Sequence, residues 1–247
     1  MLLEATPTTP AEFYIPERAL VIVAHADDIE FGASGTIARW TDGGCQVTYC
    51  IVTDNGAGSN KPDTIPSQLM ATRRAEQIAS AEVVGVTDVR FLNYTDGMLE
   101  PTLALRKDLT RIIRQVRPQV VITLDPTSVI IEAPDFVYIN HPDHRATGEA
   151  ALYAVFPSAG TRLIFPELLA EGLEPHSVDY LYLAIGLQGS LVVDITAVHD
   201  RKLEALSKHQ SQLTPEDLEF VTRFDTEAGK AHGYTYAESF RMLKLGE

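Results

Sequence analysis

The chain has 247 residues, of which 45% are hydrophobic and 22% are charged, so it can bury a full core as one globular domain. Its formal net charge of −14 repels the phosphate backbone of nucleic acids and anionic membrane surfaces, so we expect neither as a partner. No run approaches the roughly 20 apolar residues of a membrane span, and the first residues lack an export-signal pattern, which together predict a cytoplasmic protein.

The first half of the chain alternates short β-branched runs with amphipathic stretches that end at glycine or proline. This alternation predicts the order β-α-β-α-β-α-β with short connections, after a proline-containing arm at residues 1–16 that we expect to lack regular structure. The strands are expected at 19–24, 46–53, 89–92 and 120–124, and the helices at 29–42, 67–84 and 102–116.

The second half of the chain has a less regular pattern. Residues 125–140 are expected to be an irregular connection, and no internal repeat or low-complexity linker marks a domain boundary. We therefore predict one domain over residues 1–247, a Rossmann-like three-layer α/β sandwich with a mainly parallel sheet, in which 157–247 form a small integral C-terminal lobe. A helix is expected at 147–156, strands at 180–185 and 191–195 as a hairpin or as separate strands, helices at 198–209 and from 214, and an extended finish at 240–243.

Polar residues cluster at two of the predicted strand-to-helix turns. His25 and Asp28 follow the first strand, and His144 opens the helix after the fourth strand. In a doubly wound sheet of order 3-2-1-4-5, strands one and four are neighbours, so both clusters would meet at the carboxyl edge of the sheet. A catalytic zinc site takes three His or carboxylate ligands and keeps one position for water, and these three residues supply such a set.

Three further polar residues of these clusters are left for catalysis. Asp27 is a candidate general base, and His141 would stand across the metal as an acid or oxyanion partner. Asp143 would orient His141 and raise its pKa. Asp27 and Asp28 are also residue types that favour a helix N-cap. Glu30 is interpreted as a first-turn residue that complements the helix dipole or as a residue that supports the site residues from behind. Either cluster alone is a weak signal, but both together favour a metal site.

The same residues carry a resemblance to a known family. The run Ala-His-Ala-Asp-Asp-Ile-Glu-Phe-Gly at residues 24–32 resembles the Ala-His-Pro-Asp-Asp-Glu signature of the LmbE-like, or PIG-L, zinc N-deacetylases. The run His-Pro-Asp-His at 141–144 resembles the second signature of that family, and residues 202–212 resemble a further family stretch. The chain departs from the pattern at Ala26, where proline is usual, and at Ile139, where some members have tyrosine; here Tyr138 is its neighbour.

The resemblance implies roles for the site residues. It gives a Rossmann-like fold, the zinc ligands His25, Asp28 and His144, the base Asp27, and His141 as the residue that aids the tetrahedral intermediate. Fe²⁺ or another divalent metal remains an alternative to zinc.

The resemblance also implies a substrate. Family members typically remove acetyl from N-acetylglucosamine-like sugars. Arg73 is similar to the arginine that holds sugar hydroxyls, and Asp96 to the acidic sugar contact. An arginine at a helix start can equally be a surface charge, and Asp96-Gly97 is an ordinary turn pair. We therefore expect a zinc-dependent N-deacetylase, a hydrolase of linear amides, that acts on the 2-acetamido group of an N-acetylglucosamine-type substrate.

Two other functions stay open at this point. The enzyme could cleave a different amide, such as a thiol conjugate, or the protein could be a non-catalytic sugar- or nucleotide-binding module with a degenerate metal site. Against a nucleotide module, the first turn lacks a G-x-G-x-x-G phosphate cradle and has only Gly32 and Gly35. The sequence leaves the number of subunits open, including a homo-oligomer.

Overall fold

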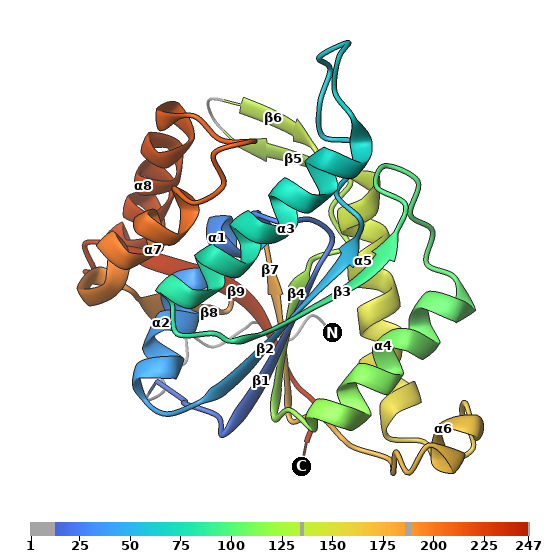
Figure 1. Cartoon of the computed structure of the whole chain (residues 1–247). Helices are drawn as coiled ribbons and strands as arrows, with labels where there is room; N and C mark the ends of the chain where they lie inside the picture. The colour runs from blue at the N-terminus through green and yellow to red at the C-terminus, as the bar shows by residue number, and fades with distance from the viewer. Residues whose placement is uncertain (1–12, 134–135, 186–188, 247) are drawn as a thin grey trace.

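The computed structural model describes residues 13–133, 136–185 and 189–246, so most of the expected N-terminal arm lies outside the described part. Seven strands form one sheet in the order β3-β2-β1-β4-β7-β9-β8 (Figure 1). Strands β3, β2, β1, β4 and β7 run parallel, and β9 is antiparallel to both of its neighbours. The predicted parallel sheet and the order 3-2-1-4 are confirmed. The bounds are β1 Arg18–Val23, β2 Gln46–Thr53, β3 Asp88–Tyr94, β4 Val120–Leu124, β7 Tyr180–Ala184, β8 Leu191–Asp194 and β9 Ala237–Lys244.

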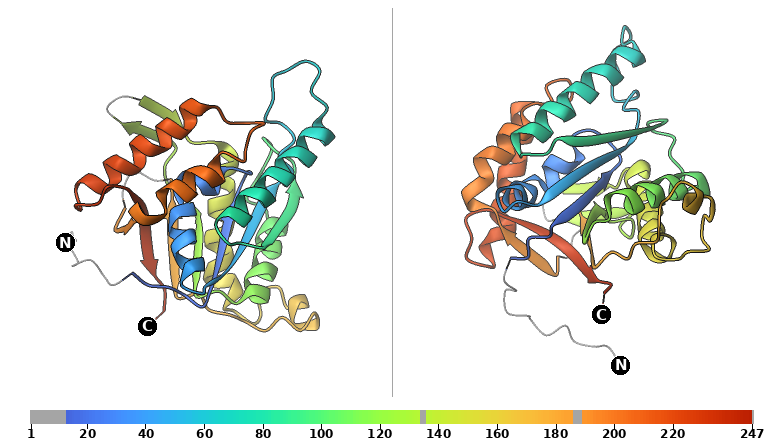
Figure 2. Two further views of the ribbon diagram at one scale, coloured as in Figure 1. Left: turned by 60° about the vertical axis from the view of Figure 1, so that its left-hand side comes forward. Right: turned by 60° about the horizontal axis from the view of Figure 1, so that its bottom comes forward.

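Helices cover both faces of this sheet, which gives the three layers that the sequence predicts (Figures 1 and 2). One core lies between the sheet and α1 and α2, with Ile37 and Trp40 fully buried; the other lies against α4 and α5, with Leu109 fully buried. Among the described residues, no helix is both long and apolar enough to cross a bilayer. The bounds are α1 Asp28–Gly32, α2 Ser34–Asp42, α3 Pro66–Val83, α4 Leu103–Val116, α5 Pro142–Tyr153, η1 Ala154–Ala159, α6 Glu167–Ala170, η2 Thr196–Val198, α7 His199–Leu206 and α8 Pro215–Lys230.

Strand β1 is the centre of the parallel part of the sheet. It pairs with β2 on one side and with β4 on the other, and its residues 19–23 are at most 2% exposed. A continuous apolar run is what a parallel strand needs when helices cover both of its faces. Because β1 and β4 are adjacent and parallel, the turns that follow them lie at the same edge of the sheet.

The structure differs from the sequence prediction at the first helix and in the connection after β4. The helix expected at 29–42 is two helices that meet at Ala33. Residues 125–140, expected to be irregular, hold the antiparallel pair β5 (Ile130–Ala133) and β6 (Phe136–Ile139). Of the two arrangements expected for β7 and β8, the structure has separate strands, because β9 lies between them. The pairings of β9 with β7 and β8 join segments that are far apart in the chain, and a local sequence pattern does not reveal such pairings.

Candidate active site

The turn after β1 holds Asp27 in a backbone conformation that residues other than glycine rarely adopt. Its φ is 95°, and its N–H donates a hydrogen bond to Gln77 Oε1 on α3 at 3.1 Å. The Gln77 side-chain amide donates in turn to Glu30 Oε1 at 3.1 Å, and His209 Nε2 lies 3.3 Å from Glu30 Oε2. Gln77, Glu30 and His209 are at most 1% exposed. A buried network therefore fixes the strained residue.

Sequence reasoning did not assign this supporting network. It took Glu30 either for a first-turn helix residue or for a partner of the site residues, and it gave no role to Gln77 or His209. The available signal was weak: His209 falls within the family-like stretch 202–212. The network shows that this stretch contacts the turn that carries Asp27.

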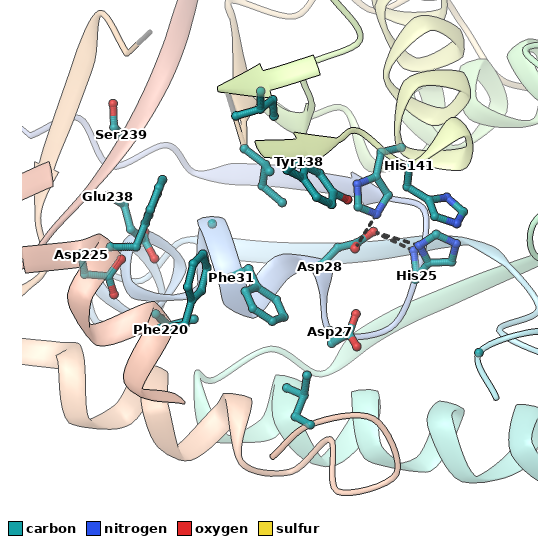
Figure 3. A pocket seen from close by; sticks show the side chains of 18 of the residues that line it. His25, Asp27, Asp28, Phe31, Tyr138, His141, Phe220, Asp225, Glu238 and Ser239 are labelled. Carbon is teal, nitrogen blue, oxygen red and sulfur yellow. Dashed lines mark hydrogen bonds and ion pairs between the residues drawn. The ribbon is translucent and has the colours of Figure 1, made fainter. Parts of the chain in front are cut away.

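The two predicted clusters meet in one cavity, as Figure 3 shows. The ring centroid of His25 lies 5.3 Å from that of His144 and 4.8 Å from that of His141. Asp28 lies between the two turns, with Oδ1 3.0 Å from His144 Nε2 and Oδ2 3.7 Å from His25 Nδ1. Asp28 Oδ2 also accepts the backbone N–H of His25 at 2.8 Å, so its carboxylate is fixed by its own turn.

Two more carboxylates flank His25. Asp96 Oδ1 and Asp143 Oδ2 lie 3.1 and 3.3 Å from His25 Nε2. Asp143 is fully buried and accepts the backbone N–H groups of Gly97 and Leu99 at 2.7 and 3.2 Å. Asp96 thus reaches the site through β3 and its following turn, although the sequence suggested it only as a sugar contact.

Asp143 acts on His141 through its backbone more than through its side chain. The Asp143 carboxylate contacts His25, and it is the backbone N–H of Asp143 that donates to His141 Nδ1, at 3.1 Å. The pKa of His141 is lowered, because burial and the neighbouring His25 and His144 outweigh the pull of Asp143. Asp143 does raise this pKa, as expected, but burial and the two neighbouring imidazoles set the net direction, and the Asp143 side chain contacts His25.

The electrostatics of the turn favour a positive charge at His25. Burial opposes protonation, but contacts with Asp143, Asp28 and Asp96 raise the pKa of His25 to about 12. Burial also raises the pKa of Asp27 to about 7, against the lowering effect of Arg73. A group of carboxylates this close together and this deeply buried needs a cation among them.

Arg73 contacts the turn itself. Its side chain is 5% exposed, and its Nη2 donates to the Ala26 carbonyl oxygen at 2.7 Å and lies 3.4 Å from Asp27 Oδ2. Arg73 also lines the cavity. The residue that the sequence suggested as a sugar contact therefore also holds the carboxylate of Asp27.

Tyr138, the neighbour of Ile139, supplies a tyrosine side chain to the cavity. Ile139 is 72% exposed, whereas Tyr138 lines the cavity beside His141 (Figure 3). Burial raises the pKa of the Tyr138 phenol, partly offset by a hydrogen bond from the backbone N–H of His141. A phenol hydroxyl is thus present in the cavity.

The donor atoms fit a divalent metal ion. Nitrogen atoms of His25, His141 and His144 lie within 4.8 Å of one another, with the Asp28 carboxylate between two of them. Within the described part of the chain, His144 Nδ1 is buried without a hydrogen-bond partner. Imidazole and carboxylate ligands suit zinc and related metals. A parallel sheet with such donors and a buried carboxylate at its carboxyl edge has the features of a metal-dependent hydrolase.

Comparisons with known proteins identify the family. A family model described as PIG-L, GlcNAc-PI de-N-acetylase, matches residues 20–155. The chain is 32% identical to diacetylchitobiose deacetylase of Thermococcus kodakarensis over 92% of this chain and 83% of that protein. It is 30% identical to a probable N-acetyl-alpha-D-glucosaminyl L-malate deacetylase 2 of Bacillus cereus, over 79% of this chain and 83% of that protein.

The solved structure of N,N'-diacetylchitobiose deacetylase from Pyrococcus horikoshii is similar as well, with a TM-score of 0.84 at 32% identity. The match covers 93% of this chain and 84% of that one. The chain belongs to the PIG-L family of metal-dependent deacetylases. The family and the fold predicted from the sequence are both confirmed.

Proposed function

We propose that the protein removes the acetyl group from the 2-acetamido group of an N-acetylglucosamine-type substrate, with water as the second reactant and a free amine and acetate as products. The observation that carries the proposal is the meeting of His25, Asp28 and His144 beside Asp27 in one cavity. The deacetylase activity named for the relatives supports it.

His25, Asp28 and His144 would hold the metal, for which we propose zinc, with Fe²⁺ as the alternative that the same donors accept. The bound ion would polarise the amide carbonyl and lower the pKa of a water molecule to about 7. Asp143 touches neither substrate nor metal in this scheme; it positions His25 through the 3.3 Å contact to Nε2.

Asp27 would take the proton from the attacking water and pass it to the departing nitrogen. Its carboxylate stands on one side of His25 and Asp28, and His141 on the other (Figure 3). His141 would stabilise the negative charge that develops on the carbonyl oxygen. The Tyr138 hydroxyl lies beside His141 and would help to bind the same oxygen.

Asp96 remains the proposed contact for a sugar hydroxyl, because it lines the cavity next to His25. For Arg73 we propose a double role, in which it faces the sugar and also holds Asp27.

The test is acetate release from a panel of N-acetylated sugars, with and without a chelator. We expect release that the chelator abolishes and that added zinc restores. Release from an N-acetylated thiol conjugate but from no sugar would favour the amidase alternative. A protein that binds metal but releases no acetate from any amide would be a binding module.

A further inference from the structure

The cavity continues well beyond the metal-binding residues. Its volume is about 930 Å³, near the upper end of the roughly 300–1,000 Å³ of small-molecule sites. The part outside the two turns lies between helix α8 and the β5–β6 hairpin. These two elements lie near each other at one edge of the molecule (Figures 1 and 2). A sugar at the metal would therefore leave a large part of the cavity for its substituent.

Helix α8 turns an apolar face to this outer part. Phe220, Phe224 and Ala228 follow one another at spacings of four, which places them on one side of the helix, and all three line the cavity. The rings of Phe220 and Phe224 are stacked, with centroids 6.2 Å apart. Figure 3 shows Phe220 close to Phe31 of α1.

The β5–β6 hairpin supplies the opposite wall with Ile131 and Val137, and Leu213 closes one side. Val137 is 68% exposed and Phe224 46% exposed. Burial of such exposed apolar surface under an apolar ligand group is favourable, because it removes that surface from water.

The charges of the cavity disfavour an anion. Among the described lining residues, Arg73 is the one lysine or arginine, and it already contacts Ala26 and Asp27. An anion in the outer part would therefore find no free lysine or arginine among the described lining residues to bind it. The carboxylates that line the cavity are Asp27, Asp28, Asp96, Asp225, Glu227 and Glu238.

Two of these carboxylates are also already bonded. Lys202, which is fully buried, lies 2.9 Å from both Asp225 and Glu238. Glu238 further accepts the backbone N–H groups of Gly35 and Thr36 at 2.9 and 2.7 Å. Both carboxylates are at most 3% exposed, so they offer little surface to the hydroxyls of a second sugar.

Building on the proposed deacetylase function, we propose that this outer part binds the aglycone, and that the aglycone is an uncharged alkyl or aryl group. A malate group, as in the name of the Bacillus relative, would find no free lysine or arginine among the described lining residues. Those hydroxyls of a second sugar ring that faced Phe224 and Val137 would be desolvated there without new hydrogen bonds, which is costly. An alkyl or aryl group meets neither penalty and covers the exposed apolar wall.

The experiment compares kcat/KM for acetate release from the methyl and octyl glycosides of N-acetylglucosamine, from diacetylchitobiose and from N-acetylglucosaminyl malate. A buried methylene contributes up to about fourfold, so burial of only about two to three of the added methylenes makes octyl exceed methyl by on the order of 30-fold. Octyl should also exceed diacetylchitobiose, and the malate conjugate should fall below methyl. Equal values for octyl and methyl, or a higher value for diacetylchitobiose or malate than for octyl, would overturn the inference while leaving the deacetylase function intact.

Failure of the deacetylase function would look different, because no sugar would release acetate. The aglycone site is then judged by calorimetry with octyl glucoside, which has no acetamido group. Binding of octyl glucoside but not of methyl glucoside supports the site, and binding of neither overturns it.

Substitutions in the apolar wall test whether this wall causes the preference for the octyl glycoside. Phe224→Ala and Leu213→Ala should each lower the octyl-to-methyl ratio of kcat/KM by about fivefold or more, because each removes apolar wall. The matched control is Leu163→Ala, since Leu163 is 82% exposed and outside the cavity lining. A ratio that falls equally in Leu163→Ala, or that stays unchanged in both wall variants, would contradict the proposal.

Discussion

The backbone N–H of Asp27 donates a hydrogen bond to the side-chain oxygen of Gln77 at 3.1 Å, and this contact joins the end of β1 to the middle of α3. Asp27 has a φ of 95°, a conformation that costs roughly 1–3 kcal/mol and persists only when neighbours hold it. Gln77 is itself oriented by Glu30, so the position of the proposed base depends on a buried chain of contacts.

Gln77→Leu should therefore lower kcat by about 10- to 100-fold with little change in metal content, because the variant keeps the side-chain volume but loses the acceptor. Steady-state kinetics and metal analysis measure the two quantities. The matched control is Gln119→Leu, since Gln119 Oε1 accepts the backbone N–H of Arg18 at 2.8 Å at the other end of the sheet. If kcat stays within twofold of the wild type, Gln77 does not position the base.

Asp27→Asn should reduce kcat by about 10²–10⁴-fold, because asparagine cannot take a proton from water. Asparagine also tolerates a positive φ, so the turn should keep its shape. The bound metal should stay near the wild-type amount in elemental analysis. A variant that retains most of its turnover would assign the proton transfer to another group.

His144→Ala should lose the metal, since it removes one imidazole and leaves Asp28 without its 3.0 Å contact. Elemental analysis after purification measures this, and the melting temperature of the variant should no longer rise when zinc is added. His232→Ala is the control, because His232 is exposed and lies outside the cavity lining. An undiminished metal content in His144→Ala would rule out the proposed ligand set.

The buried pair of His209 and Glu30 should make stability depend on pH. Burial opposes the charge on His209, but the Glu30 carboxylate raises its pKa above 6.5. A raised histidine pKa stabilises the folded state fully below the unfolded value and loses this effect as the pH rises through the folded value. Urea unfolding should thus show a larger difference between the wild type and His209→Gln at about pH 6 than at about pH 9. A difference that is constant over this range would show that the pair is not charged.

Lys202→Met should destabilise the fold by about 3–5 kcal/mol, because it leaves the buried carboxylates of Asp225 and Glu238 without their cation. The free energy of unfolding in urea measures the loss. Lys208→Met is the control: Lys208 pairs with Glu204 at 3.2 Å on the surface, where such a pair contributes about 0–1 kcal/mol. Equal effects of the two substitutions would mean that the buried cluster does not stabilise α8 against β9.

The parallel part of the sheet could be predicted because its strands and helices alternate along the chain and are joined by short connections. Right-handed crossovers and short connections predict that β1 lies between β2 and β4, and the structure has this order. The position of β9 could not be predicted, since it pairs with β7 and β8 across long stretches of chain. The break at Ala33 was also hidden, because the apolar pattern continues through it.

The proposed metal ligands stood out in the sequence because His25, Asp28 and His144 follow strand ends, where apolar runs change abruptly to polar ones. Their supporting residues had no such signal. Gln77 lies in the middle of a helix that reads as amphipathic, and its role depends on which residue of another element it faces. Tyr138 lies one position before Ile139, where some family members have tyrosine. A shift of one position places a side chain on the other face of a strand.

The central claim is that the two turns bind one divalent ion between them. Anomalous diffraction at the zinc edge, from crystals grown with zinc, tests it most directly. We predict one strong peak within bonding distance of His25, Asp28 and His144, and its loss in crystals of His144→Ala. A zinc-loaded crystal with no peak at these three side chains, or with the peak at another group, would contradict the account.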